Sequence, residues 1–476
     1  MRTKVKINAS KAVRTWPRVE RYQNSTLRFA PPADFPAFWS EKHSRPKIMR
    51  CWVTLDEVWD YRTDEYFWNY QIGVNRYKDD PHHHEYDWGS TVPSEVRIQT
   101  YLAAHSEHCE EILLNLRRYE KETQLGIVSL DKYEEVVERV IEYYKDLYPN
   151  VRYIEPCNES DYVCFGGIDT EHYYKLYTRA CRAVRRLNER HRYEIPLEIG
   201  GIAMNAVMDR PHLWRQFLQQ LANDKDERRK IDFYSMHDYN GHPKRMKVFY
   251  EMHHAWIKEL GLPDLPIFVD EYGFTQTTGV WTDSLKNASG VLSAIFLSTD
   301  LPGMHIFPWC TFHNPSYQMS FTQYLLLEDG QFASTPNGNA MRLLHMLKTD
   351  QLEMLGEHRH RVIATGDATG YAMLATNPSD KPMAVDLMLR DIPHDKVTIT
   401  EYRVDALYNN RLTGPVCTEL GLTNRWNEWV RGSEKGVDIA TVLEPYGFTL
   451  WLVEPYQTPS PFPTTKALDL SVNGLE

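Results

Sequence analysis

The chain has 476 residues, 42% of them hydrophobic, and a formal net charge of −11. This length is too great for one ordinary core, so we expect a large domain joined to a smaller one. The acidic balance argues against nucleic acid as the main partner, because nucleic-acid binding is driven by basic surface. No segment has the unbroken apolar run that a membrane span needs, so we expect no membrane partner either.

The seven cysteines are odd in number, and several fall inside apolar or helical stretches. This usage predicts buried free thiols in a reducing compartment, not a disulfide framework. Residues 1–23 lack the apolar central region of a secretory signal. A cytoplasmic location is therefore expected, unless a leader was removed and Met1 replaced, in which case the protein is secreted.

The first part of the chain predicts few regular elements. The stretch KVKIN, residues 4–8, could add an edge strand to a sheet, and residues 18–30 show only a weak strand pattern. Residues 47–55, KIMRCWVTL, predict a strand. An insertion at residues 56–90, unusual in its size and aromatic content, follows that strand.

From about residue 95 onward, helical and strand-like patterns alternate with some regularity. The helical segments carry apolar residues three and four positions apart, and the strand segments are short runs rich in Ile, Val and Phe. Strands are expected at residues 110–119, 151–156, 194–201, 231–239, 265–274 and 303–312. Helices are expected at residues 94–109, 130–149, 170–191, 212–224, 244–260, 288–298 and 338–348. This is the pattern of repeated βα units.

These six strands, the strand at residues 47–55 and a weaker one within residues 18–30 make eight. Eight parallel strands with outer helices form a (β/α)8 TIM barrel of the usual size. We prefer this α/β barrel to a doubly wound sheet, because no Gly-rich phosphate-binding fingerprint follows an early strand.

After Lys348 the hydrophobic pattern changes to alternation with a period of two, interrupted by turn residues such as Asn-Pro-Ser-Asp. It predicts a C-terminal antiparallel β-sandwich domain. We therefore expect residues 1–14 as a strand that can join the β-sandwich, 15–348 as the barrel, 349–456 as the β-sandwich and 457–476 as a surface tail.

In a (β/α)8 barrel, chemistry is built where the strands end. Polar or aromatic side chains occupy these predicted strand ends: Asn158, Glu159, His237, Tyr239, Glu271 and Trp309. Taken one at a time, each is more simply explained as a solvated acid, a structural ion-pair partner or a core residue. Their ordered joint occurrence favours a site, because two carboxylates across a barrel mouth are what glycoside cleavage requires.

These motifs resemble those of the clan A retaining glycoside hydrolases, most of all glycoside hydrolase family 39, which includes β-xylosidases and α-L-iduronidases. RYIEPCNESD is similar to the family's fourth-strand motif, and PIFVDEYGFT is similar to its seventh-strand motif. The resemblance, which spans roughly residues 85–455, implies that Glu159 is the acid/base and Glu271 the nucleophile. It also implies that His237 and Tyr239, in IDFYSMHDY, line the sugar subsite.

Two departures from the family concern the walls of the site. The family's fourth-strand motif reads Asn-Glu-Pro, whereas here Ser160 follows Asn-Glu. Arg50 and Trp52 stand where the family has a second-strand Arg-x-His-Gly motif, and we include both among the candidate substrate-binding residues. Both glutamates are intact, so the implied chemistry is kept while the substrate is left open.

We therefore expect a retaining glycoside hydrolase that acts by double displacement on an oligosaccharide, a polysaccharide or a glycoside such as a β-xyloside. Asn158 would bind the 2-hydroxyl of the sugar, Tyr239 or His237 would hold Glu271 or a ring hydroxyl, and Trp309 would form an apolar floor. Two alternatives stay open. One is an endo-acting depolymerase of the same clan, and the other is a catalytically inactive carbohydrate-binding protein.

No cofactor is needed for this chemistry, and we expect no metal. The histidine run at residues 82–84 lacks the i, i+4 spacing of helical zinc pairs. Lys244 and Arg245 could meet an acidic sugar, but they more simply begin the next helix. The sequence permits a homo-oligomer without requiring one.

Overall fold

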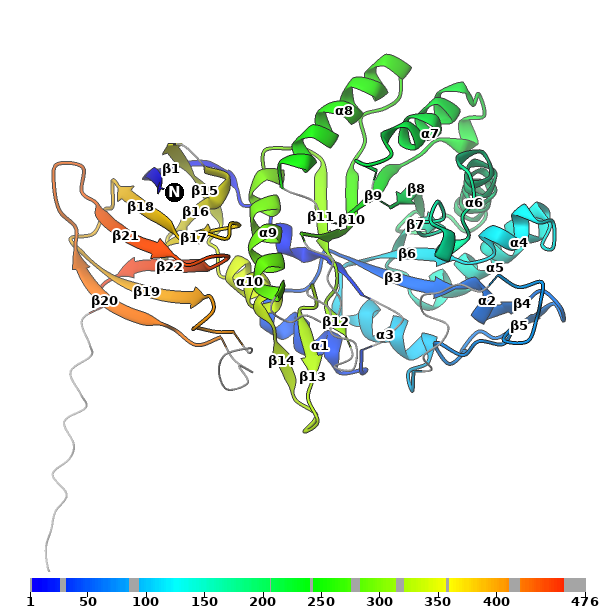
Figure 1. Cartoon of the computed structure of the whole chain (residues 1–476), viewed down its shortest axis with the longest axis horizontal. Coiled ribbons are helices and arrows are strands. Elements are labelled where there is room, and N and C mark those ends of the chain that lie inside the picture. Colours follow the sequence, from blue (N-terminus) through cyan, green and yellow to red (C-terminus); the bar gives the residue numbers. More distant parts are fainter. Residues whose placement is uncertain are drawn as a thin grey trace, which may run out of the picture.

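The computed structural model describes residues 2–25, 31–84, 94–205, 207–239, 243–274, 283–313, 321–356, 359–410 and 420–457. Within these ranges a barrel of strands and helices lies beside a β-rich part, with α9 and α10 between them (Figure 1). The two parts are joined by hydrogen bonds such as that from Thr376 Oγ1 to the Ser289 carbonyl, 3.1 Å long. In the described part of the chain no helix combines the length and apolar character that crossing a bilayer requires.

The barrel is built on one sheet of eight parallel strands in the order β11-β10-β9-β8-β7-β6-β3-β2. The strands are β2 (Tyr22–Asn24), β3 (Ile48–Thr54), β6 (Glu111–Arg117), β7 (Val151–Pro156), β8 (Glu198–Met204), β9 (Phe233–Tyr239), β10 (Ile267–Gly273) and β11 (Met304–Pro308). The Asn24 carbonyl accepts a hydrogen bond from Thr311 N, just beyond β11, at 3.0 Å, which links the first strand to the last. The predicted α/β barrel is confirmed, with the weak segment at residues 18–30 supplying the eighth strand.

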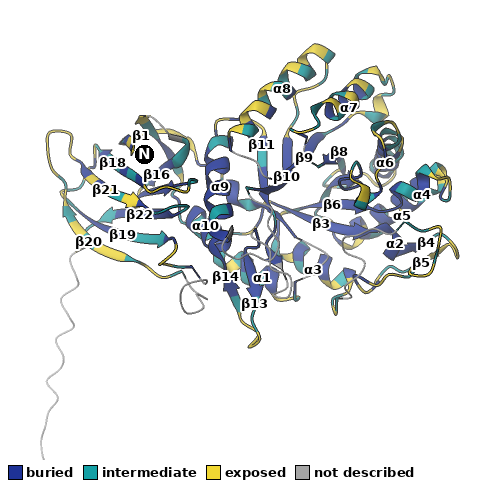
Figure 2. Cartoon of the chain, viewed as in Figure 1, coloured by how far each residue is buried: buried dark blue, intermediate teal, exposed yellow. Residues whose placement is uncertain are grey.

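The outer helices of the barrel follow the predicted ranges, except that α1 was not predicted and α9 begins five residues earlier than expected. They are α1 (Phe35–His43), α3 (Ile98–His108), α5 (Leu130–Leu147), α6 (Thr170–His191), α7 (Pro211–Asn223), α8 (Lys244–Leu260), α9 (Asp283–Ser298) and α10 (Pro336–His345). Shorter helices are α2 (Leu55–Val58), α4 (Glu120–Gln124) and the 3-10 turns η1 (Val19–Arg21), η2 (Val163–Phe165), η3 (Glu227–Arg229) and η4 (Arg359–Arg361). On α5, α6, α7 and α8 the inner face is buried and the outer face is more exposed, as the 3.6-residue period dictates, whereas α9 and α10 are buried nearly all round (Figure 2).

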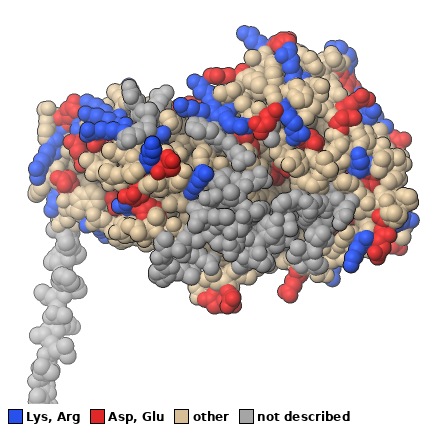
Figure 3. Space-filling model, in the orientation of Figure 1, with Lys and Arg blue, Asp and Glu red and all other residues tan. Residues whose placement is uncertain are grey.

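The helices α5 and α6 show how the sequence fixes this outer layer. The Ser129 side chain accepts a hydrogen bond from Lys132 N at the start of α5, and Asp169 does the same for His172 N at the start of α6. Such caps satisfy backbone donors that have no partner within the helix. Between the two helices Glu134 lies against several arginines of α6, including Arg186 at 2.6 Å. Acidic and basic side chains are interspersed over the barrel in the view of Figure 3.

The barrel interior is layered with the two-residue period of its strands. The lowest layer is an aromatic and aliphatic cluster of Tyr22, Ile48, Leu113, Tyr153, Phe233, Phe268 and Phe307. Two residues further along five of these strands comes a fully buried polar layer of Arg50, Asn115, Glu155, Ser235 and Asp270. The candidate site lies on top of this polar layer, at the carboxyl ends of the strands.

The β-rich part is one sheet of nine strands in the order β20-β19-β22-β17-β16-β15-β1-β18-β21. The strands are β1 (Arg2–Thr15), β15 (Asp350–Gly356), β16 (Val362–Asp367), β17 (Gly370–Thr376), β18 (Met383–Arg390), β19 (Lys396–Val404), β20 (Asn424–Trp429), β21 (Val437–Leu443) and β22 (Phe448–Pro455). Side chains from β18 and β21 share one core with those of β19 and β22, so the two ends of the sheet pack face to face as a sandwich.

The N-terminal strand β1 lies inside this sheet, antiparallel to β15 and parallel to β18. The pairing of β1 with β18 is the one parallel pairing among those described in this sheet. The other described pairs are antiparallel. Two small sheets complete the structure: β4 (Trp59–Asp60) with β5 (Glu65–Tyr66), and β12 (Phe312–His313) with β13 (Tyr324–Leu326) and β14 (Phe332–Ser334). The domain boundaries drawn from the sequence stay a proposal.

Candidate active site

The two candidate catalytic glutamates lie at the carboxyl ends of barrel strands. Glu159 is in the turn that follows β7, Glu271 is within β10, and each is 5% exposed. The pairing of β10 with β9 shifts between Val269 and Glu271. Because side chains normally alternate between the two faces of a strand, this irregularity lets the adjacent Asp270 and Glu271 both turn inward. Both of these carboxylates contact the buried Arg50.

The turn that carries Glu159 holds the backbone in an unusual conformation. Glu159 has a φ of 46°, in the left-handed region that non-glycine residues rarely adopt. Its N–H donates to the Ala203 carbonyl, just before the end of β8, at 2.8 Å. A strained backbone persists only when its surroundings fix it, and such residues cluster at functional sites. The turn therefore aims the Glu159 side chain at the barrel axis.

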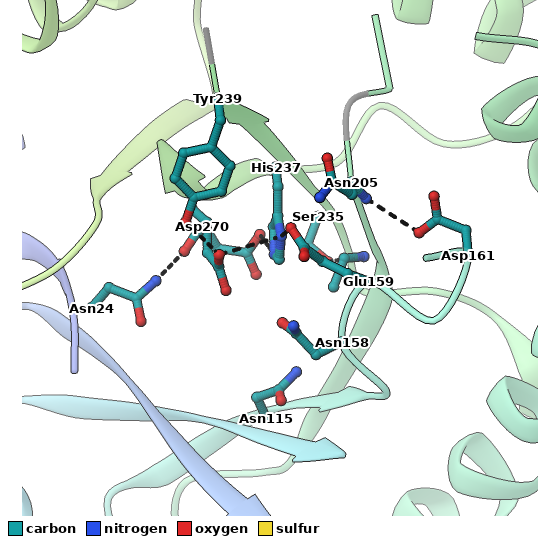
Figure 4. Close-up of polar contacts among 12 residues, drawn as sticks. Asn24, Asn115, Asn158, Glu159, Asp161, Asn205, Ser235, His237, Tyr239 and Asp270 are labelled. Atoms are coloured by element: carbon teal, nitrogen blue, oxygen red, sulfur yellow. Dashed lines mark hydrogen bonds and ion pairs between the residues drawn. The ribbon is translucent and has the colours of Figure 1, made fainter. Parts of the chain in front are cut away.

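His237, near the end of β9, contacts both glutamates, and Figure 4 shows it beside Glu159. Its Nδ1 is 2.7 Å from Glu159 Oε1 and 3.6 Å from Glu271 Oε2. On the other side of the ring, Nε2 is 3.5 Å from Asp270 Oδ1. Burial lowers the pKa of His237 to about 4, so the imidazole is neutral at neutral pH. A neutral ring hydrogen-bonds Glu159 without adding a charge to the site.

Arg50, in the middle of β3, is completely buried beneath the glutamates. Its Nη1 donates to Glu271 Oε1 at 2.8 Å, and its Nε and Nη2 donate to Glu155 Oε2 at 2.9 and 2.7 Å. Nη2 also donates to Asn158 Oδ1 at 2.8 Å. We expected Arg50 among the substrate-binding residues. Its Nε, Nη1 and Nη2 all donate to protein acceptors, so a role in substrate binding stays a proposal.

The polar layer below the site contains two further carboxyl groups, Glu155 and Asp270. Burial opposes ionisation of Glu155, but the adjacent Arg50 guanidinium holds its pKa below the ordinary value. Burial and the neighbouring Glu155 charge raise the pKa of Asp270 well above its ordinary value. Asn115 Nδ2 donates to Glu155 Oε2 at 2.8 Å, and Asn24 Nδ2 donates to the Asp270 carbonyl (Figure 4). Glu155 thus carries the charge that balances Arg50, and Asp270 is the protonated partner.

The environments of Glu159 and Glu271 differ in the charge that they favour. Burial raises the pKa of Glu159 to about 7, although a hydrogen bond from Asn205 and the charge of Arg50 oppose the shift. Burial also raises the pKa of Glu271, and the Arg50 charge and a hydrogen bond from Tyr239 counteract the shift. Glu271 is in direct contact with a cation and Glu159 is not. The arrangement therefore favours a protonated Glu159 beside an ionised Glu271.

Aromatic side chains surround the glutamates. The Tyr239 hydroxyl donates to Glu271 Oε2 at 2.5 Å. Trp309, half-buried beyond β11, packs edge to face on Trp52, with ring centroids 5.7 Å apart, and also contacts Phe321 at 6.5 Å. The expected set of Asn158, Glu159, His237, Tyr239, Glu271, Trp309, Arg50 and Trp52 therefore gathers at this one end of the barrel.

A second group of residues holds the acid/base turn and was not predicted. Asp161 forms an ion pair with Arg210, which also donates to the Asn205 carbonyl at 3.2 Å. Asn205 N donates to Asp161 Oδ1 at 3.3 Å (Figure 4). The contacts tie the loop after β7 to the loop after β8. Asp161 follows Ser160 in the segment that departs from the family motif. That departure was the one feature of the sequence that could have pointed to these contacts.

Glu159, His237 and Glu271 offer ligand-type atoms that all lie within 4.8 Å of one another, the one such group of three in the described ranges. The 2.7 Å contact between His237 and Glu159 has the geometry of a hydrogen bond.

Away from this site, His83 is 3.2 Å from Asp56 Oδ2 and 3.0 Å from Glu122 Oε1. Arg245 lies in the first turn of α8, 3.1 Å from Asp209.

Comparison with protein families finds no match, and comparison with curated protein sequences finds none either. Solved structures do match. A family 39 glycoside hydrolase from Xanthomonas axonopodis pv. citri has a TM-score of 0.68 at 14% identity, covering 96% of this chain and 98% of that one. A monomeric β-xylosidase from Caulobacter crescentus has a TM-score of 0.68 at 14% identity, with 96% and 100% covered.

The chain has the fold of the family 39 glycoside hydrolases. A bacterial orthologue of human α-L-iduronidase also matches, with a TM-score of 0.63 at 14% identity over 96% of this chain and 84% of that one. The resemblance inferred from the strand-end motifs is thus confirmed for the fold. At these identities the comparison shows the glycoside hydrolase fold alone, and the chemistry has to be argued from the site.

Proposed function

We propose that this protein hydrolyses O-glycosidic bonds with net retention, using Glu271 as the nucleophile and Glu159 as the acid/base. One observation carries the proposal: oxygens of the two carboxyl groups lie within 4.8 Å of each other at the mouth of the barrel. Retaining enzymes hold these groups about 5–5.5 Å apart, whereas inverting enzymes need roughly 6.5–9.5 Å to admit a water. The short spacing supports double displacement.

In the first step, Glu271 attacks the anomeric carbon while Glu159 gives its proton to the departing oxygen. The products are a glycosyl ester of Glu271 and a free alcohol. Arg50 and Tyr239 each donate a hydrogen bond to Glu271, which keeps the carboxylate ionised and oriented for attack. The raised pKa of Glu159 supplies the proton in the resting enzyme.

In the second step, Glu159 takes a proton from water, and the water oxygen attacks the anomeric carbon and releases Glu271. Esterification removes the negative charge of Glu271, so Glu159 ionises more easily in the intermediate than in the free enzyme. Asn158 accepts from Arg50 through its Oδ1, which directs its amide N–H groups away from Arg50. Those groups are suited to hold the 2-hydroxyl of the sugar, and Trp309 offers an apolar surface to its ring.

Activity should fall on both sides of neutral pH. Glu159 has to be protonated for the first step, and its pKa of about 7 predicts a loss of activity as the pH rises through that value. Glu271 has to be ionised, and its raised pKa places the acidic limb above the pH at which an exposed glutamate titrates. The measurement is kcat/KM for a nitrophenyl glycoside from about pH 4 to pH 9. A profile without a fall above neutral pH would contradict the role of Glu159.

The direct test is to trap the intermediate with an activated 2-fluoro-glycoside, which slows the second step more than the first. We expect a stable adduct of one sugar per chain, located on Glu271 by mass spectrometry of peptides. A panel of such reagents with different sugars also tests which sugar the site accepts. The β-xylosidase and α-L-iduronidase neighbours make xyloside- and iduronide-type reagents the first to try. An inactive carbohydrate-binding protein would take no label from any of them.

A further inference from the structure

Arg117 is the last residue of β6, and its position follows from the two-residue period of that strand. Leu113 belongs to the lowest layer of the barrel interior, and Asn115 donates to Glu155 in the polar layer above it. Arg117 comes two residues later and therefore faces inward at the top layer. It is 6% exposed, close to the 5% of Glu159 and Glu271. The guanidinium thus reaches the mouth of the barrel.

Among the described residues, the Arg117 guanidinium packs on an aromatic ring and its Nε has no hydrogen-bond acceptor. Its central carbon is 4.8 Å from the centroid of Trp52, the same indole that Arg50 approaches at 4.5 Å. Its Nε is buried without a hydrogen-bond partner, and no described carboxylate lies within ion-pair distance of it. Arg50, by contrast, is held by three carboxylates and Asn158. A buried guanidinium without an acceptor is costly and calls for an explanation.

The buried carboxyl groups of Asp56, Glu57 and Glu120 interact electrostatically with Arg117, but none of them forms an ion pair with it among the described contacts. Burial and the neighbouring Asp56 raise the pKa of Glu57, which disfavours its charged form. Asp56 itself is engaged with His83 at 3.2 Å and with Arg118 at 3.9 Å. Burial and the neighbouring Arg118 charge lower the pKa of Arg117, so a bound anion would stabilise its charged form. Among the described residues, the top of β6 therefore presents a buried guanidinium whose Nε is not hydrogen-bonded and which forms no ion pair at contact distance.

We propose that Arg117 binds an anionic substituent of the substrate, a carboxylate or a sulfate ester on the sugar that Glu159 and Glu271 cleave. This rests on the proposed function and names a substrate class for it. A guanidinium offers a planar fork of donors that fits a carboxylate or a sulfate with two parallel hydrogen bonds. Arg117 and Arg50 both contact the Trp52 ring, so the bound anion would lie close to the residue that holds Glu271.

The experiment compares matched aryl glycosides that differ only in charge: a neutral hexoside, the corresponding uronide and the corresponding 6-sulfate. The wild-type enzyme should prefer one of the anionic substrates, and the preferred one tells carboxylate from sulfate. Arg117→Met should reduce kcat/KM for that substrate about 10- to 100-fold, the value of a charged hydrogen-bond pair, and leave the neutral glycoside nearly unchanged. Arg117→Lys should recover part of the loss. Arg228→Met, an exposed change on η3, should affect none of the substrates.

Turnover of the neutral glycoside with no preference for either anionic one would overturn this inference and leave the proposed function intact. Absence of turnover and of Glu271 labelling with every substrate would instead overturn the proposed function. If Arg117→Met fails to fold, the thermal unfolding of the wild-type protein with added sugars still tests the preference for an anionic sugar. A free hexuronate or hexose 6-sulfate should raise its Tm more than the parent hexose does, and equal shifts would contradict the inference.

Discussion

Replacing Glu271 by alanine should reduce glycoside turnover on the order of 10⁵-fold, the size of loss seen when a covalent nucleophile is removed. The substitution leaves no group that can form the glycosyl-enzyme and opens space at the anomeric carbon. Added azide should enter that space and attack the sugar directly. The expected product is a glycosyl azide of inverted configuration, detected by NMR, because one displacement replaces two.

The control for this substitution is Glu259→Ala. Glu259 lies on the surface of α8, paired with Arg215, and its removal should leave turnover unchanged. Arg50 loses an acceptor in Glu271→Ala, so the unfolding temperature of each variant has to be recorded beside the rate. A folded Glu271→Ala protein with substantial activity and no azide product would show that another residue is the nucleophile.

Replacing Glu159 by glutamine should lower kcat/KM most for the substrates with the poorest leaving groups. A general acid contributes about 10²- to 10⁴-fold, so loss of that order is expected for oligosaccharides and alkyl glycosides. The leaving group of a dinitrophenyl glycoside needs little protonation, so the rate of the first step should fall far less for these substrates. The measurement is kcat/KM across leaving groups of different pKa, with the alkaline limb near neutral pH expected to disappear as well.

Glutamine keeps the shape of Glu159 and can still hydrogen-bond His237, so the comparison isolates the proton. Glu189→Gln, an exposed change on α6, is the matched control. Equal losses on activated and unactivated substrates would remove the acid role of Glu159. In that case the raised pKa of this buried group would reflect its burial alone.

Much of the barrel follows from the sequence because its elements are long and strongly periodic. The helices α5 and α6 repeat apolar residues three and four positions apart over many turns, and the structure places them within a few residues of the predicted bounds. The strand β2 gave only a weak pattern, because three residues carry too little periodicity to read. The place of β1 between β15 and β18 depends on partners far along the chain, which no local pattern identifies.

The candidate site divides in the same way. The strand-end residues Glu159 and Glu271 could be selected because they follow or end short apolar runs. Glu155 and Asp270 could also have been placed inside the barrel, since each lies two residues after an inward-facing aromatic residue. The contacts that fix the turn at Glu159 could not be predicted. They depend on a left-handed backbone and on Asp161 meeting Arg210 from another loop, and neither leaves a periodic trace.

The central claim is that Glu271 forms a covalent bond to the sugar while Glu159 faces it across the anomeric carbon. Peptide mapping after reaction with a 2-fluoro-glycoside tests this most directly. The account predicts one fluoro-sugar per chain on the peptide that contains Glu271, with release when an acceptor restarts the second step. Turnover of the parent glycoside with the label on another residue, or with no covalent label at all, would contradict it.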